Sequence, residues 1–174
     1  MKIAATRLLT GRLELQRLTE DDAGLMLAIW NDPAFIRHVG DRGVRTIDQA
    51  LAAMRDTLAL FESHGYGAWR IAPRGGGPAM GICGLFKREN LDHPDIGYAI
   101  LPDWRGQGFT LEAARAVMAE ARDGLGLERV NAIVSPDHRR SIRLLEKLGM
   151  RVQGPIRMPG EDADILLYAL NFDQ

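Results

Sequence analysis

The sequence predicts a single mixed α/β domain spanning residues 1–174. Its 174 residues, 46% of them hydrophobic, are enough to bury one continuous core. Apolar residues recur with a period of two in some segments and near 3.6 in others, which indicates strands mixed with helices. No linker, repeat or low-complexity tract divides the chain. We therefore expect a central mixed sheet of about six to seven strands with about four helices.

The first part of the chain predicts one strand and then two helices. Residues 11–18, GRLELQRL, alternate apolar and polar side chains as a half-buried strand does. Thr19 caps a helix with acidic residues in its first turn, and NDPAF after Trp30 stops it. The following IRHVGDRGVR is expected to be irregular. Thr46 then begins a second amphipathic helix that ends at Gly65.

The remaining elements follow from shorter runs. We expect strands at GAWRIAP, AMGICGLF and DIGYAIL, then a helix after the glycine loop, and finally strand RVNAIV, helix RRSIRLLEKLGM and strands RVQGPIRM and ADILLYALN. DIGYAIL and RVNAIV are joined through a helix. Such a connection predicts a parallel, right-handed pair.

Composition narrows the function classes. The net charge of −1 and the pI near 6.4 provide no basic field for nucleic acid. The one cysteine, Cys83, lies in an apolar run, so no internal disulfide forms and no metal is expected. No window approaches the ~20 apolar residues of a membrane span. We expect a cytoplasmic protein without membrane or nucleic-acid partners, either monomer or homodimer.

The loop PDWRGQG separates the expected strand at residues 95–101 from the helix that follows it. A helix N-terminus carries unpaired N–H donors and partial positive charge, so glycines at this point favour an anion-binding loop. The spacing matches neither the dinucleotide fingerprint nor a Walker loop, because G-x-G-x-T lacks the third glycine and no Lys follows Gly108. From these residues alone, an anion site and a simple turn before a helix both remain open.

Longer stretches carry a family resemblance. RGQGFT resembles the R/Q-x-x-G-x-G/A signature of the GNAT superfamily of N-acetyltransferases, and SPDHRRSIRLLEKLGM resembles that family's later N-x-x-S-x-x-L-x-E-K-L-G-F segment. TGRLELQRLTEDDA with WNDP is similar to the ribosomal-protein N-terminal acetyltransferase (RimJ/RimL-like) branch. The resemblance spans the whole chain in order. It implies a GNAT fold whose parallel strand pair splays at an acetyl-coenzyme A site, with no metal.

The resemblance also implies the cofactor-binding residues. The pyrophosphate cradle corresponds to Arg105, Gly106, Gln107, Gly108, Phe109 and Thr110, and the pantetheine arm to the backbone of Ile100 and Leu101, with His138 and Ser141 at the later motif. Two positions depart from the family pattern. Thr110 replaces the usual Gly or Ala, where its hydroxyl either crowds the phosphate or donates to it. His138 replaces the usual Asn, whose amide offers both a donor and an acceptor.

For catalysis, the resemblance implies that a neutral amine attacks the thioester directly, without a covalent enzyme intermediate, while backbone N–H groups between the splayed strands hold the oxyanion. Asp95 is the candidate general base, or else a solvated strand-end acid. Ser141 is the candidate donor to the departing thiolate, or else a residue stabilising a first helical turn. Relatives with a Tyr four residues later use it as the acid. Here that residue is Leu145, and Tyr168 is only a remote substitute.

The acceptor is the least determined part of the sequence. Branch resemblance favours a protein N-terminal α-amine, and the alternatives are a small-molecule amine (an amino acid or aminoglycoside) or an acyl-coenzyme A binding domain without turnover. An α-amine near pKa 8 is neutral in about one molecule in ten at pH 7, whereas a lysine-like amine is neutral in about one in 2,500. Candidate pocket residues are of three kinds: acids that attract an amine or merely form a solvated turn, arginines that suit a carboxylate, and residues that line the pocket or pack the core. They are Glu161, Asp162 and Asp164; Arg42 and Arg45; Phe35, His38 and Trp69.

Overall fold

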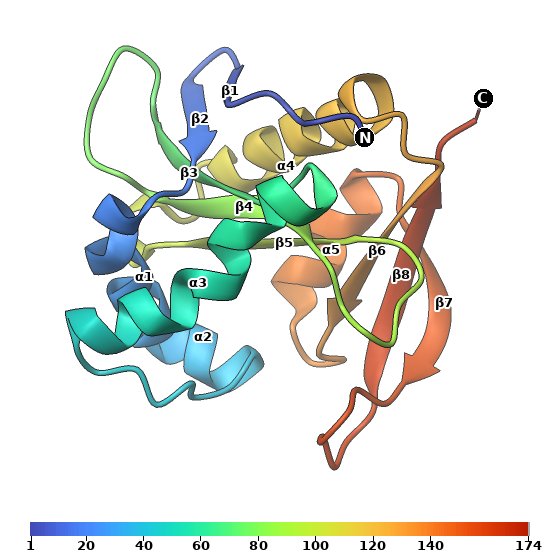
Figure 1. Cartoon of the computed structure of the whole chain (residues 1–174). Helices are drawn as coiled ribbons and strands as arrows, with labels where there is room; N and C mark the ends of the chain where they lie inside the picture. The colour runs from blue at the N-terminus through green and yellow to red at the C-terminus, as the bar shows by residue number, and fades with distance from the viewer. Residues whose placement is uncertain (174) are drawn as a thin grey trace.

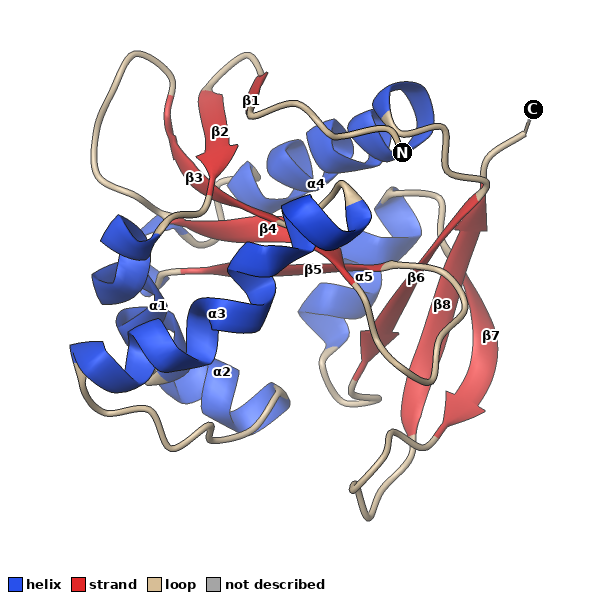
Figure 2. Cartoon of the chain, in the orientation of Figure 1, coloured by secondary structure: helices blue, strands red, loops and turns tan. Residues whose placement is uncertain are grey.

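The computed structural model describes residues 1–173 and contains one eight-stranded sheet with helices on both faces (Figures 1 and 2). The strand order is β1-β2-β3-β4-β5-β6-β8-β7. The strands are β1 (Arg7–Leu9), β2 (Leu13–Arg17), β3 (Ala68–Pro73), β4 (Gly81–Phe86), β5 (Asp95–Ile100), β6 (Arg129–Val134), β7 (Arg151–Ile156) and β8 (Ile165–Asn171). The α-helices are α1 (Ala23–Trp30), α2 (Pro33–His38), α3 (Ile47–His64), α4 (Phe109–Ala119) and α5 (Arg139–Lys147).

The sheet is weakest between β5 and β6. These strands form its one parallel pair among the described residues, as the sequence predicts, and their ladder consists of Asp95 opposite Asn131. By contrast, β4 pairs with β5 and β6 pairs with β8 along their whole lengths. Beyond Asp95 the two strands therefore separate. The separation opens a space at the carboxyl end of β5, where α/β proteins commonly bind ligands.

Two apolar clusters cover the two faces of the sheet. One packs α4 and α5 against the sheet and includes Val117, Leu145 and the fully buried Trp69. The other packs α1 and α3 against the opposite face and includes Met26 and Met54. Figure 1 shows α3 in front of the sheet and α4 and α5 behind it. The fold thus has three layers, and the helices hold the separated strands in place.

Two elements correct the prediction from sequence. NDPAF does not lead into an irregular stretch; it begins the short helix α2, in which Asp32 is the N-cap and accepts a hydrogen bond from the N–H of Phe35. Pro33 suits the first helical position as well as it suits a stop, so the signal that ends α1 also starts α2. The edge strand β1 has three residues, too few to show a period. Eight strands and five α-helices result among residues 1–173, slightly more than expected.

Neither a membrane-spanning helix nor a metal-ligand cluster is found within residues 1–173. None of the described helices combines the length and the hydropathy that crossing a bilayer requires. No three side chains of His, Cys, Asp or Glu there lie close enough together to hold a metal ion. Cys83 is buried in β4, and burial raises the pKa of its thiol. It is therefore a core residue and not a nucleophile.

Candidate active site

A cavity of about 740 Å³ lies where β5 ends, enclosed by α2, the glycine loop, the start of α4 and the start of α5. It gathers most of the residues that the sequence singles out. The predicted residues on its wall are Ile100, Arg105, Gly106, Gly108, Phe109, Thr110, His138 and Ser141, and Phe35 and His38 join them from α2. Segments distant in sequence therefore meet around one space.

The glycine loop has the backbone that the sequence predicts. Gly106 and Gly108 have φ of +76° and +81°, in the left-handed region that favours glycine. Gly108 is the N-cap of α4, so the first amides of this helix lack helical acceptors and face the loop. A Cβ at Gly106 would meet nothing within 4 Å, which leaves room beside its backbone. The loop therefore has the backbone conformation and the open space that favour an anion at a helix N-terminus.

Positive side chains reinforce this site from the opposite wall. Arg139, Arg140, Arg143 and Lys147 of α5 line the cavity, and Asp137 is the acid beside them. Such a cluster suits a ligand that carries several negative charges, since each guanidinium presents paired N–H donors. The loop and α5 together favour a polyanionic group.

Arg105 stands first in the glycine signature but is engaged within the protein. Its guanidinium forms an ion pair with Asp32, the N-cap of α2, and its Nε donates to the carbonyl oxygen of Ile100 at 3.2 Å. Arg105 thus ties α2 and β5 to the glycine loop. This geometry favours a bracing role for its side chain over a direct phosphate contact.

Three predicted residues lie outside the cavity wall. The N–H of Leu101 donates to Met80 O at 2.8 Å, so that amide is used within the protein. Gln107 turns its carbonyl oxygen toward Arg12, whose Nη1 donates to it at 3.0 Å. Asp95 lies at the other end of β5 from the glycine loop. Leu101 and Gln107 therefore shape the loop without forming the wall of the cavity.

Tyr98 is a cavity residue that the sequence analysis missed. Its Oη lies 2.6 Å from Ser141 Oγ, so the two hydroxyls share a hydrogen bond across the gap between β5 and α5. Burial raises the pKa of Tyr98, which therefore stays protonated. Leu145 of α5 stands where many GNAT relatives have the Tyr that acts as general acid. A phenol in that role must therefore come from an element other than α5. Tyr98 lines the cavity beside Ser141, whereas Tyr168 is buried in β8 and does not line the cavity.

His138 contacts α2 through its ring. It stacks on His38, with ring centroids 3.8 Å apart and planes at 17°. Burial, and then the neighbouring His38, lower the pKa of His138, so at pH 7 it is neutral and offers one donor and one acceptor. Ser135 Oγ also donates to the carbonyl oxygen of His38 at 2.9 Å. The end of α2 is therefore fixed to the segment that leads into α5.

Asp95 begins β5 and is only 1% exposed. Arg88 Nε donates to its Oδ1 at 3.0 Å. Burial raises the pKa of Asp95, although the Arg88 charge acts in the opposite direction. A raised pKa is one property that a general base requires, and Asp95 begins the strand whose other end borders the cavity. It is not a solvated strand-end acid.

The remaining acceptor candidates divide into core, surface and wall residues. Trp69 is 0% exposed and donates its Nε1–H to Ala5 O, so it belongs to the core. On the exposed hairpin between β7 and β8, Asp164 pairs with Arg157 at 3.0 Å. Arg45 likewise pairs with Asp41 at 2.6 Å, which leaves Arg42 as the other arginine of that segment.

Comparison with known proteins identifies the family. Residues 12–151 match the model of the acetyltransferase (GNAT) domain, Acetyltransf_3. The chain belongs to the GNAT acetyltransferase family. This GNAT protein is 30% identical to the N-acetyltransferase YoaA of Bacillus subtilis over 149 residues, which cover 85% of the chain and 84% of YoaA. It is 25% identical to the N-acetyltransferase p20 of Bacillus licheniformis, with 94% of each chain covered.

Solved structures show that this GNAT chain has the same fold throughout. An acetyltransferase from Agrobacterium tumefaciens aligns with a TM-score of 0.82 at 22% identity, covering 99% of this chain and 98% of the other. RimL, a ribosomal L7/L12 α-N-protein acetyltransferase in complex with coenzyme A, aligns with a TM-score of 0.82 at 16% identity, covering 96% and 98%. The predicted fold class is confirmed, including the mixed sheet.

Proposed function

We propose that this GNAT protein transfers an acetyl group from acetyl-coenzyme A to the primary α-amine of a protein or peptide N-terminus. The observation that carries the proposal is the single cavity that joins the glycine loop and the start of α4 to the hydroxyl pair of Tyr98 and Ser141. One end of this cavity suits phosphates. The other presents proton donors beside the separated strands.

The residues present fit the acetyl donor. The amides of the glycine loop at the α4 N-terminus would hold the diphosphate of the donor, and the arginines of α5 supply further positive charge. Ile100 and Tyr98 flank the path from that loop along β5, on the edge that β6 does not pair. When bound, the donor supplies an activated acetyl carbonyl. The protein supplies position and proton transfer.

The proton path follows from two groups at different heights of β5. Asp95 accepts the proton of the attacking amine, through one water, because its buried carboxylate has a raised pKa. As the C–N bond forms and the C–S bond breaks, Ser141 Oγ donates to the departing sulfur. Tyr98 Oη then returns a proton to Ser141, to which it is hydrogen bonded. The cycle closes when solvent takes the proton from Asp95 and returns one to Tyr98, which restores the phenol that its raised pKa favours.

The α-amine is preferred as acceptor for two reasons. Its ordinary pKa near 8 leaves about one molecule in ten neutral at pH 7, so one carboxylate base is enough. The fold is also that of RimL, whose name assigns it an N-terminal acceptor. A small-molecule amine is the second candidate. It is favoured by the similarly folded MccE, described as a microcin C7 self-immunity acetyltransferase and solved with acetyl-CoA and AMP (TM-score 0.78).

The test is the release of free coenzyme A thiol, measured with acetyl-coenzyme A and a panel of amines. The panel holds short peptides with free N-termini, the same peptides N-formylated, lysine side-chain analogues, free amino acids and an aminoglycoside. We expect release with free N-termini and none with blocked ones. Thiol release with only the aminoglycoside or only free amino acids would mean that the acceptor is a small-molecule amine and not a peptide N-terminus. Binding of acetyl-coenzyme A without release from any amine would overturn the enzyme proposal in favour of an acyl-coenzyme A binding domain.

A further inference from the structure

The turn between β1 and β2 contacts the glycine loop, although it is not part of the cavity wall. Arg12 of this turn donates from its Nη1 to the carbonyl oxygen of Gln107 at 3.0 Å. Its Cζ lies 4.3 Å from the centre of the Phe109 ring, and its Nη2 lies 3.4 Å from the position that a Cβ of Gly108 would take. One guanidinium group therefore lies against three successive residues of the loop.

Glu112 of α4 fixes the position of this guanidinium group. Its Oε2 accepts a hydrogen bond from Arg12 Nε at 2.7 Å. Its Oε1 accepts from the backbone N–H of Arg12 at 2.9 Å and from Thr10 Oγ1 at 2.8 Å. Because the Arg12 side chain is 50% exposed, the ion pair itself contributes little to stability. What these contacts provide is geometry, since they join the turn, the start of α4 and the glycine loop.

The carbonyl group of Gln107 determines where the next amide points. The peptide between Gln107 and Gly108 is trans and planar, so its C=O and its N–H point in opposite directions. With the oxygen directed at Arg12, the Gly108 N–H is directed away from Arg12, and it has no acceptor within residues 1–173. Glycines on both sides of Gln107 also permit the opposite orientation of this peptide. The contact with Arg12 therefore selects the orientation that leaves the Gly108 amide available to an anion.

Arg12 also neutralises an acid close to the same place. Glu112 stands in the first turn of α4, which begins at the glycine loop. A carboxylate there stabilises the free helix but repels an anion bound at the helix N-terminus. Among residues 1–173, Arg12 is the one cation that pairs with Glu112. The pairing therefore reduces this repulsion.

We infer that Arg12 is a positioning residue for acetyl-coenzyme A, which holds the Gln107–Gly108 peptide in the orientation that binds the diphosphate and neutralises Glu112 beside it. The inference rests on the proposed function, which assigns the diphosphate to this loop. Arg12 does not line the cavity. It therefore acts through the loop and not by contact with the ligand.

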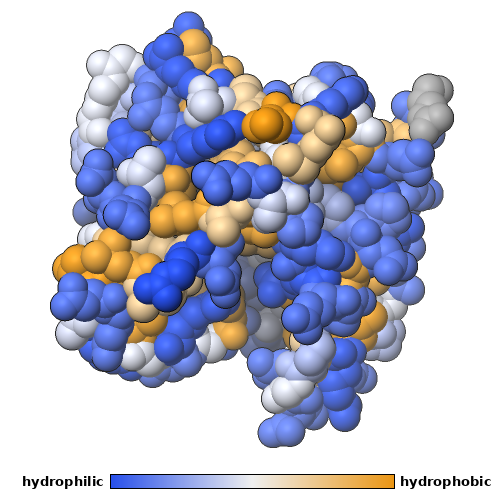
Figure 3. Space-filling view, viewed as in Figure 1, coloured by the Kyte–Doolittle hydropathy of each residue, from blue (hydrophilic) through white to orange (hydrophobic). Residues whose placement is uncertain are grey.

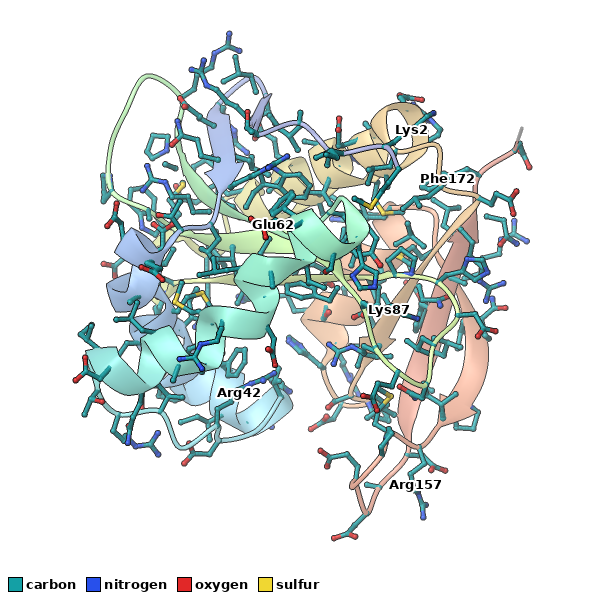
Figure 4. The ribbon with its side chains drawn as sticks, in the orientation of Figure 1. Lys2, Arg42, Glu62, Lys87, Arg157 and Phe172 are labelled. Atoms are coloured by element: carbon teal, nitrogen blue, oxygen red, sulfur yellow. The ribbon has the colours of Figure 1, made fainter. Side chains whose placement is uncertain are left out.

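The β1–β2 turn lies at the surface, so Arg12 can be replaced without disturbing the core. In Figure 1 this turn is near the top of the molecule, above α4. Figure 4 shows nitrogen-bearing side chains projecting around it, and Figure 3 shows hydrophilic residues mixed with apolar ones there. The same hairpin also offers a matched control. Arg7 of β1 pairs with Glu14 at 2.8 Å, is 55% exposed and does not contact the glycine loop.

The test is calorimetric titration with acetyl-coenzyme A of the unchanged protein and of Arg12→Gln, Arg12→Lys and Arg7→Gln. We expect Arg12→Gln to bind about tenfold more weakly, the scale of one hydrogen bond from a charged donor. Arg12→Lys restores the positive charge beside Glu112 but not the paired donors, so its affinity should lie between the two. Arg7→Gln should bind as the unchanged protein does. Thermal unfolding of each variant verifies that it is folded.

Turnover distinguishes positioning of the donor from a general loss of structure. With an amine that supports thiol release, Arg12→Gln should raise the KM for acetyl-coenzyme A about tenfold and leave kcat within about twofold. The reason is that Arg12 contacts the loop and α4, whereas Tyr98 and Ser141 are not among its partners. A lower kcat with an unchanged KM would overturn the positioning role.

The outcomes separate this inference from the proposed function. An unchanged Kd in Arg12→Gln, or an equal loss of affinity in Arg7→Gln, overturns the positioning role even if amines are acetylated. A loss of affinity confined to the Arg12 variants, with no thiol release from any amine, supports the positioning role and rejects the acetyltransferase proposal. If the unchanged protein does not bind acetyl-coenzyme A, both fail.

Discussion

Gly108→Val tests the glycine loop most directly. Gly108 has φ of +81° and caps α4, and a Cβ there would first meet Arg12 Nη2 at 3.4 Å. That atom is the end of a flexible side chain, so the cost is mainly backbone strain and not overlap. An L-residue in the left-handed region costs about 1–2 kcal/mol, and a β-branched side chain is especially disfavoured there. The loop is therefore expected to relax and turn its amides away from the cavity.

That strain sets the expected size of the effect. If the variant must regain the original loop to bind, about 1–2 kcal/mol is lost from binding, which corresponds to about 5- to 30-fold weaker affinity for acetyl-coenzyme A. The same strain lowers Tm by about 2–8 °C in a chain of this size, which leaves the protein folded. Calorimetric titration with acetyl-coenzyme A measures the first quantity, and thermal unfolding measures the second.

Gly75→Val is the matched control. Gly75 has φ of +90° with nothing within 4 Å of its ideal Cβ, and it lies in the loop between β3 and β4, away from the cavity. We expect a similar loss of stability and an unchanged affinity. Unchanged affinity in Gly108→Val would remove the glycine loop from the binding site. An equal loss of affinity in both variants would show that the effect is not local.

The remaining predictions concern the proton carriers and His138. Asp95→Asn should lower turnover most where the amine is protonated and recover in part at high pH, and a loss that is uniform across pH would reject the base. Because burial raises the pKa of Asp95, its ionised form destabilises the fold; Asp95→Asn should therefore have the higher Tm at pH 7, an advantage that shrinks as pH falls through the raised pKa toward 3.8. Tyr98→Phe should reduce kcat by about 100-fold or more with little change in the Kd of acetyl-coenzyme A, whereas unchanged kcat excludes Tyr98 from proton transfer. Since the pKa of His138 is lowered, any pH dependence of that Kd should lie below pH 6.5, and His138→Asn should flatten it; identical curves from pH 5 to 8 would mean that His138 does not contact the cofactor.

Local patterns explain why most of the fold can be predicted from the sequence. Alternating side chains identify β2, a short strand-like run identifies β5, and the apolar stripe after Thr46 identifies α3. Elements shorter than two of their own periods escape this method. The helix α2 has six residues and β1 has three, so neither completes a recognisable repeat. The Asp-Pro pair that begins α2 is ambiguous in isolation, because it marks the end of one helix as well as the start of another.

The candidate site likewise has a part that the sequence predicts and a part that it does not. The glycine loop is continuous in sequence, so its conformation and its place before α4 could be predicted. The Tyr98–Ser141 hydrogen bond joins residues 43 apart, and the Arg105–Asp32 ion pair joins residues 73 apart. No local pattern encodes such pairs, since they depend on how the sheet brings the elements together. Even so, Tyr98 stands two residues before Ile100 on the same strand, and this alternation is the one sequence signal that places both side chains on the same face.

The early separation of β5 from β6 gives the sheet an edge inside the molecule. Leu101 N–H donates to the carbonyl oxygen of Met80, the residue before β4. Alternation along the strand directs the Tyr98 and Ile100 amides to the other side, beyond the last pair with β6. An outer edge invites pairing with foreign chains, whereas this one borders the cavity, so a ligand in the cavity can reach it. Amide hydrogen exchange measures whether the amides along this edge are hydrogen bonded. The Tyr98 amide should exchange quickly in the free protein and slow down on cofactor binding, while the Ala99 amide, bonded to β4, stays protected throughout.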